Sequence, residues 1–184
     1  MKETTIDQTL VLCDLDSLLL DAAGNLPQLQ RDVLQLFASR GGRLTVFSQR
    51  SPRAVRSLLG GVRLSAPALV CGGTLAYNFS EGSGTALCSF EGMEESVLKM
   101  LPSLSGVGIA LQMQDGSTRV LRMSEALERH LRQEWTPYLL ANAADIKGEE
   151  VLRVLLFQYQ EEQIPLQELE AICKSGFAAS GESA

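Results

Sequence analysis

The sequence predicts an α/β fold, in which a parallel sheet with helical crossovers is followed by an α+β module. Apolar strand-like runs at 10–13, 44–47 and 68–71 alternate with helical patterns. Such alternation with short connections is typical of a parallel sheet with right-handed crossovers. From about residue 80 the strands and helices no longer alternate simply. We therefore expect a core over residues 1–79 and an α+β module over residues 80–184.

The elements of the core follow from apolar spacing and from signals at the ends of helices. The run 10–13 predicts a buried strand, and the helical pattern after Pro27 ends at a pair of glycines. A second strand is expected at 44–47. Ser51 and Pro52 then predict the N-cap and the first turn of a second helix.

In the α+β module, glycine-containing turns separate the strand-like runs. The sequences SEGSG and DGS predict two hairpin turns. The expected hairpin strands are 75–79 with 85–90 and 107–113 with 119–123. The other expected elements are helices at 93–101, 125–135 and 166–174 and a strand at 151–159.

Composition and charge argue against several classes of protein. The formal net charge is −6 and the basic residues are scattered, which disfavours a nucleic-acid partner. No apolar run approaches the roughly 20 residues that span a bilayer, and the start MKETTIDQTL lacks the apolar stretch of a signal peptide. The 4 cysteines form no CxxC pair, which favours free thiols in a reducing compartment. We expect a cytoplasmic protein with no membrane partner.

Two acids one residue apart, Asp14 and Asp16, follow the first strand. Because parallel strands end at one edge of a sheet, we expect these acids to share a crevice with Ser48, with Leu12 and Val46 buried behind them. The pair alone could also be a polar strand end that starts a loop. The functional interpretation is phosphoryl transfer, in which one carboxylate attacks phosphorus and the other moves protons. Carboxylate and phosphate repel, so such a site requires a divalent cation, for which Mg²⁺ is the usual choice.

These segments resemble motifs of a known family. VLCDLDSLLL at 11–20 is similar to the first motif of the haloacid dehalogenase (HAD) superfamily, an apolar strand followed by DxDGTLL, and FSQRS at 47–51 resembles its second, TGRS. LVCGGTLAYN at 69–78 and IKGEEVLRVLLFQYQEE at 146–162 resemble segments of the Cof-type sugar-phosphate phosphatases. The resemblance implies a HAD-like Rossmannoid parallel sheet, partial in this chain, with an inserted α+β cap over 80–184.

The resemblance also implies roles for individual residues. Asp14 would be the nucleophile and Asp16 the acid and base, and both would bind Mg²⁺. Ser48 and Gln49 would bind the substrate phosphate. The implied activity is Mg²⁺-dependent hydrolysis of a small phosphorylated metabolite of the sugar-phosphate class, through an aspartyl-phosphate intermediate. The sequence departs from the family motifs at four positions, which are Ser17, Leu18, Gln49 and Gly72.

The family's third motif supplies a Lys and its fourth supplies acids, commonly as GDxxND, and neither follows the cap here. We therefore expect the resemblance to cover about the first two-thirds of a full member. An open sheet edge beside strand 10–13 would favour a homo-oligomer. The isolated chain is expected to be weakly active or inactive. The alternative is a non-catalytic binding or regulatory protein that a partner chain completes.

Four further side chains receive structural interpretations. His130, the single histidine, and Arg50 are expected at the surfaces of helices. Trp135 and Tyr138 are expected to pack inside the cap rather than to face a substrate. An ordinary dinucleotide-binding fold is disfavoured because no glycine fingerprint follows the first strand.

Overall fold

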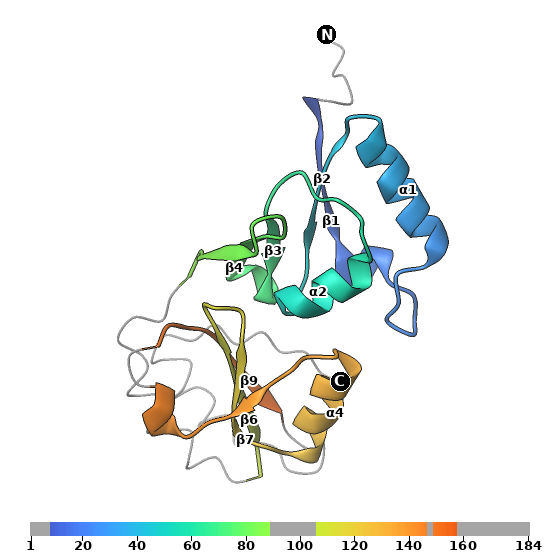
Figure 1. Ribbon diagram of the computed structural model, residues 1–184. Coiled ribbons are helices and arrows are strands. Elements are labelled where there is room, and N and C mark those ends of the chain that lie inside the picture. Colours follow the sequence, from blue (N-terminus) through green and yellow to red (C-terminus); the bar gives the residue numbers. More distant parts are fainter. Residues whose placement is uncertain (1–7, 89–105, 147–148, 158–184) are drawn as a thin grey trace, which may run out of the picture.

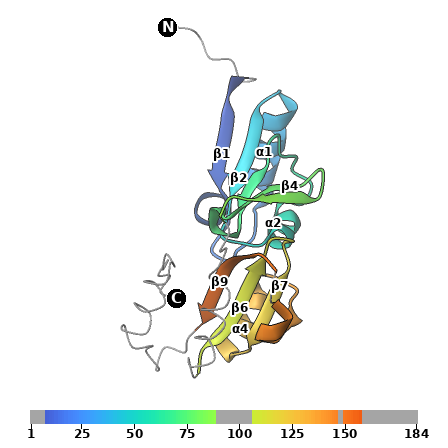
Figure 2. The same cartoon turned by 90° about the vertical axis from the view of Figure 1, so that its left-hand side faces the viewer.

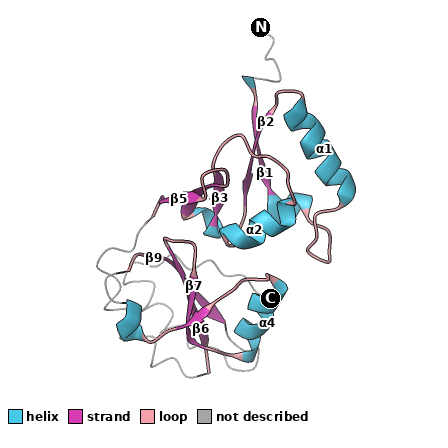
Figure 3. Ribbon diagram, viewed as in Figure 1, coloured by secondary structure: helices cyan, strands magenta, loops and turns pink. Residues whose placement is uncertain are grey.

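The computed structural model describes residues 8–88, 106–146 and 149–157, and its strands form two sheets (Figures 1 and 3). The first sheet has the order β1-β2-β3-β4-β5 and the second has the order β8-β7-β6-β9. The strands of the first sheet are β1 (Leu10–Asp14), β2 (Arg43–Phe47), β3 (Ala68–Val70), β4 (Leu75–Asn78) and β5 (Ser83–Ala86). Those of the second are β6 (Gly108–Met113), β7 (Thr118–Arg122), β8 (Leu139–Leu140) and β9 (Val151–Phe157).

Longer helices join the strands, and short helical turns follow several of them. The helices are α1 (Gln28–Ser39), α2 (Pro52–Leu59) and α4 (Glu125–Gln133), and the turns are η2 (Leu15–Leu19), η3 (Cys71–Gly73) and η5 (Ala143–Ile146). Helix α2 begins as the sequence predicts, because the side chain of Ser51 accepts a hydrogen bond from the amide of Ala54 and Pro52 lies in the first turn. Every helix among the described residues is too short or too polar to cross a membrane.

The connectivity of the first sheet confirms the predicted α/β class. Strands β1, β2 and β3 pair in parallel through the crossover helices α1 and α2, and β3, β4 and β5 continue as an antiparallel meander. Asp14 pairs in register with Phe47, so the residues after β1 and β2 emerge at the same edge. Figure 1 shows this edge facing the second sheet. The topology therefore brings the loops of the two HAD-like motifs together.

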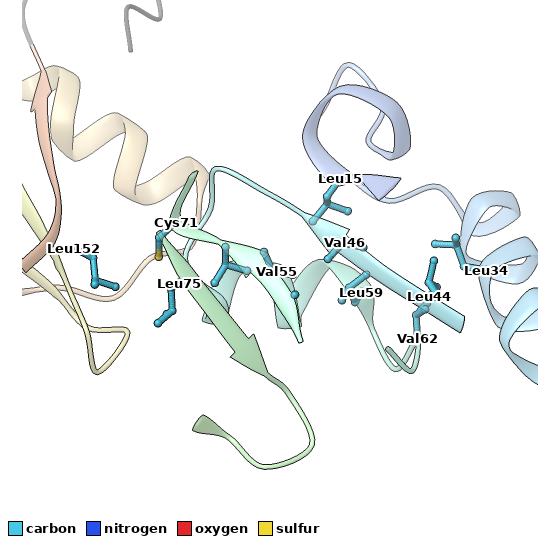
Figure 4. Close-up of a cluster of buried hydrophobic side chains, with 12 residues drawn as sticks. Leu15, Leu34, Leu44, Val46, Val55, Leu59, Val62, Cys71, Leu75 and Leu152 are labelled. Carbon is cyan, nitrogen blue, oxygen red and sulfur yellow. The ribbon is translucent and has the colours of Figure 1, made fainter. Parts of the chain in front are cut away.

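The main hydrophobic core lies between the first sheet and its helices (Figure 4). Leu44 and Val46 of β2 are fully buried there against Val55 of α2. Leu152 of β9 belongs to the same cluster, close to Cys71 and Leu75 in Figure 4. Apolar packing therefore helps to anchor the second sheet to the first.

The prediction that Leu12 is buried behind the acids is wrong. Its relative exposure is 52%, whereas Val46 is fully buried as expected. Within the described part of the chain β1 pairs only with β2, and Figure 2 shows it at the margin of the sheet. An edge strand with no neighbour on one side leaves apolar side chains in water, which the local pattern of the sequence does not reveal.

The second sheet contains the predicted β6–β7 hairpin and strand β9, and the predicted helix α4 follows β7. The short strand β8, which pairs in parallel with β7, was not predicted. The helices expected at 93–101 and 166–174 lie outside the described residues. The first sheet extends to Ala86, and the domain boundary near residue 80 stays a prediction.

Leu44 and Leu12 offer a matched test of the core. We expect Leu44→Ala to lower the free energy of unfolding by about 2–5 kcal/mol, because it leaves a cavity in the centre of the sheet. Leu12→Ala should lower it by less than about 1 kcal/mol, because half of the side chain already contacts water. Urea unfolding of both variants measures the difference, and equal losses would contradict the assigned edge position of β1.

The exposed β1 edge supports self-association, which stays a prediction. Leu10 and Leu12 are exposed apolar residues on β1, and an unpaired edge can bind another strand. We expect sedimentation velocity to detect a concentration-dependent oligomer that the edge charge of Leu12→Lys weakens. A wild-type chain that stays monomeric at all concentrations would refute this expectation.

Candidate active site

The first acid, Asp14, is held at the C-terminal end of β1 by the turn that follows it. Its Oδ1 atom accepts a hydrogen bond from the backbone amide of Ser17 at 3.0 Å. The backbone and side-chain hydrogen bonds from Ser17 lower the pKa of the Asp14 carboxyl below its ordinary value. Ser17 avoids a positive φ, so it replaces the family's glycine without that strain. These hydrogen bonds therefore favour the ionised form of the Asp14 carboxyl.

The second acid, Asp16, reaches across to the loop after β2. Its Oδ2 atom accepts hydrogen bonds from the Ser48 hydroxyl at 2.8 Å and from the Gln49 amide at 2.7 Å. Its Oδ1 atom accepts a 2.7 Å hydrogen bond from Nε of Arg50. The Ser48 hydroxyl also accepts a bond from the amide of Arg50 at 3.1 Å. The structure thus brings Asp16, Ser48 and Gln49 together, with the donors of the loop already turned toward an anion.

Arg50 lies in this loop and also contacts the residue that follows helix α4. Its Nη1 atom lies 2.7 Å from Oε1 of Glu134, which follows helix α4, while its Nε atom binds Asp16. The Arg50 side chain is only 19% exposed. The prediction that Arg50 is a solvated residue at the start of a helix is therefore wrong, because carboxylates on both sides draw the guanidinium inward.

Arg153 of β9 also reaches the loop. Its Nη1 atom donates to the backbone carbonyl of Gln49 at 3.2 Å and to the Gln49 side-chain oxygen at 3.1 Å. Gly72 lies beside this contact with a φ of +70°, and a Cβ there would come within 2.8 Å of the Gln49 oxygen. This departure from the family motif therefore fits the local packing. In the described ranges, no carboxylate forms a salt bridge with Arg153.

Sequence reasoning missed Glu134 and Arg153 as members of this site. Arg153 stands out only as one charged residue in the apolar strand VLRVLLF, and its partner Gln49 is 104 positions away. Glu134 directly follows helix α4, which carries two other acids. Such contacts depend on how the two sheets are placed, and no local pattern encodes that placement.

The described residues do not complete a magnesium site by themselves. They contain no group of three or more His, Cys, Asp or Glu side chains arranged to hold a metal ion. Asp14 is the better placed candidate ligand, because both oxygens of Asp16 already accept hydrogen bonds. Binding of Mg²⁺ by Asp14 and Asp16 therefore stays a prediction.

A crevice of about 600 Å³ lies next to Arg50. Its lining residues are Ala22, Ala23, Gly24, Asn25, Leu26, Arg31, Arg50, Ala54, Ser57, Leu58, Gln133, Glu134 and Trp135. Trp135 was expected to pack inside the cap, but this residue is 82% exposed. Tyr138 is exposed as well, so the packing prediction is wrong for both aromatic residues.

His130 of α4 is half-buried rather than exposed, and its ring packs on Phe157 with the centroids 4.5 Å apart. Burial, and then the positive charges of Arg50 and Arg153, lower the pKa of His130 below its ordinary value of 6.5. Burial also raises the pKa of the Cys71 thiol to about 12, which makes it an unreactive thiol at neutral pH.

The lowered pKa of His130 gives a testable dependence of stability on pH. The unfolded chain takes up the proton more readily, so the stabilisation is complete above pH 6.5 and is lost as the pH falls through the folded-state pKa. We expect His130→Gln, which cannot titrate, to show a smaller loss of Tm between about pH 7 and pH 5 than the wild type. Parallel Tm profiles for the two proteins would contradict the burial of a neutral imidazole.

Comparison with known proteins places this site in a family. The sequence matches the family model described as haloacid dehalogenase-like hydrolase over residues 11–180. Comparison with curated protein sequences gave no match. Solved structures of similar fold include TM0651 from Thermotoga maritima, with a TM-score of 0.69 and 17% identity over 90% of this chain and 61% of that one.

Two phosphatases of the superfamily also have this fold. BT1666 from Bacteroides thetaiotaomicron has a TM-score of 0.68 and 15% identity, over 95% of this chain and 63% of its own. The subclass IIB sugar phosphatase BT4131 has a TM-score of 0.69 and 13% identity, over 90% of this chain and 62% of its own. The chain thus spans about three-fifths of the length of these structures, and the likeness to them concerns the fold. With most of its sequence matched by the family model, the chain belongs to the haloacid dehalogenase-like hydrolases.

Proposed function

We propose that the protein is a phosphatase of this family that acts on a small phosphomonoester of the sugar-phosphate class. The observation that carries the proposal is that the loop after β2 binds an anionic group, the carboxylate of Asp16. The Ser48 hydroxyl and the Gln49 amide both donate to a carboxylate oxygen of Asp16, so the same donors can hold an oxygen of a phosphate. Asp14 stands ionised at the end of the neighbouring strand.

The proposed reaction has two steps. A carboxylate oxygen of Asp14 attacks phosphorus, the bond from phosphorus to the leaving oxygen breaks, and protonated Asp16 gives its proton to that oxygen. A water molecule then attacks the aspartyl-phosphate and loses a proton to Asp16. Inorganic phosphate leaves, and the free Asp14 carboxylate is restored. Bound Mg²⁺ would supply positive charge that offsets the repulsion between Asp14 and the phosphate.

The contacts of Asp16 define what substrate binding must change. In the described structure its oxygens are held by Ser48, Gln49 and Arg50. A phosphate that takes over the donors of Ser48 and Gln49 would release Asp16 to serve as the proton donor. Substrate binding and activation of the acid would then be a single event, in which the phosphate replaces the Asp16 carboxylate on the donors of Ser48 and Gln49. Arg153, beside Gln49, adds positive charge near the exchanged group.

The same contacts favour a second candidate function, that of a non-catalytic binding or regulatory protein completed by a partner chain. A carboxylate that stays bound to Ser48, Gln49 and Arg50 cannot move protons for a substrate. The free thiols of Cys13 and Cys71 support a reducing, cytoplasmic location for either function.

Activity of the isolated chain tests the proposal. With Mg²⁺ and p-nitrophenyl phosphate, we expect the 184-residue chain to hydrolyse the ester at little above background. The described residues do not complete a metal site, and loss of such a cation clamp typically costs about a thousandfold or more in rate. The residual activity should vanish in Asp14→Asn, which keeps the shape but removes the attacking charge.

Asp32→Asn serves as the matched control, because Asp32 lies on α1 and binds only Gln28 among the described contacts. This variant should keep the residual activity. Turnover that survives Asp14→Asn would contradict the proposed nucleophile. Robust turnover that depends on Asp14 would instead show that the chain is not impaired. Phosphate binding with no turnover at all would favour the non-catalytic alternative.

A further inference from the structure

The single tryptophan of the chain occupies a backbone position that normally suits glycine. Trp135 directly follows the C-cap of α4 and has a φ of +49°. The amide of Thr136 donates to the carbonyl of Leu131 at 3.0 Å, and the amide of Trp135 donates to that of Arg132 at 3.1 Å. This is the Schellman arrangement, in which the left-handed residue is usually glycine because a Cβ is disfavoured there. The backbone therefore does not explain a tryptophan.

Packing does not explain it either. The residue is 82% exposed, so its large apolar side chain is scarcely removed from water. A lone exposed apolar residue is common on protein surfaces. An exposed indole on a disfavoured backbone conformation is less ordinary. A glycine at this position would avoid both the backbone strain and the exposure of an apolar side chain.

The surroundings of Trp135 suggest what the indole contacts. It lines the crevice of about 600 Å³ together with Arg50 and Glu134. Most of the remaining lining comes from residues 22–26, between η2 and α1, and from residues of α2. A volume of this size suits a small organic ligand. Because Arg50 also binds Asp16, the crevice adjoins the proposed phosphoryl-transfer site.

We propose that Trp135 is a stacking surface for a ring in the leaving group of the phosphomonoester. The flat face of an indole packs well against the C–H face of a sugar ring, and charged groups beside it can bind the hydroxyls. Arg50 and Glu134 provide such groups in the lining of the crevice. Trp135 is thus a specificity residue for pyranose phosphates over acyclic phosphates. The inference rests on the proposed function for the identity of the bound group.

Fluorescence of the single tryptophan gives a direct test. Titrations use the full chain carrying Asp14→Asn, which prevents turnover, with glucose 6-phosphate, glycerol 3-phosphate and inorganic phosphate as separate ligands. We expect a saturable change of the Trp135 emission with glucose 6-phosphate. Its Kd should be about tenfold lower than that of glycerol 3-phosphate, which is the size of effect that one stacked ring gives. Equal affinities for the cyclic and acyclic esters would overturn the inference.

Substitution of Trp135 separates a ligand contact from a structural role. Calorimetric titration of Trp135→Gly should give equal Kd values for the two esters, whereas Trp135→Phe should keep part of the preference. The Tm of Trp135→Gly should equal or exceed that of the parent, because glycine suits the positive φ. A lower Tm with an unchanged preference for the ring would show a structural role and overturn the inference. Tyr138→Ala, on an exposed aromatic residue outside the crevice lining, should leave the preference unchanged.

The outcomes also separate this inference from the proposed function. Ring-selective binding that depends on Trp135, in a protein with no Asp14-dependent hydrolysis, would support the stacking surface and refute the phosphatase. Asp14-dependent hydrolysis without any ring preference would support the phosphatase and refute the stacking surface. Failure of all three ligands to bind would overturn the inference.

Discussion

The site depends on the guanidinium of Arg50, which is held between two carboxylates from different parts of the fold. Asp16 follows β1 in the first sheet, and Glu134 ends the helix packed on the second. Both contacts are 2.7 Å long and the side chain is mostly out of water, so they are stronger than an exposed ion pair. Without Arg50, each acid would lose this half-buried charged partner. One side chain therefore links Asp16 of the first sheet region to the residue that follows helix α4.

In this arrangement the loop after β2 already binds an anion, the carboxylate of Asp16 from the turn after β1. The donors of Ser48 and Gln49 converge on a carboxylate that belongs to the same chain. Under the proposed function, an external phosphate would compete with that carboxylate, whose tether gives it a high effective concentration. The affinity for phosphate would then be lower than the donors alone would give. The same exchange would couple phosphate binding to the release of Asp16, and so would make this acid available only when a ligand is bound.

The sequence predicted those features that depend on neighbouring residues or on the rules of parallel sheets. The Ser51 cap, the alternation of strands and helices, and the meeting of Asp16 with Ser48 all follow from local patterns and from the shared edge of β1 and β2. The exposure of Leu12 depends on which strand lies beside β1. The burial of Arg50 and the contact of Arg153 with Gln49 depend on the docking of the second sheet. Periodicity along a chain carries no information about such docking.

Among the described residues, Leu152 provides an apolar contact between the two sheets, and Arg50 and Arg153 provide polar ones. Leu152 is buried in the core of the first sheet, whereas its neighbour Arg153 turns its charge to the loop of Gln49. The pairing of β9 with β6 is irregular here, because Arg153 lies opposite Gln112 whereas Val151 lies opposite Met113. Leu152 is therefore an extra residue on β9, as in a β-bulge, which interrupts the regular pairing of a strand and bends it locally. The irregularity thus falls at the point where β9 contacts both the core of the first sheet and the loop after β2.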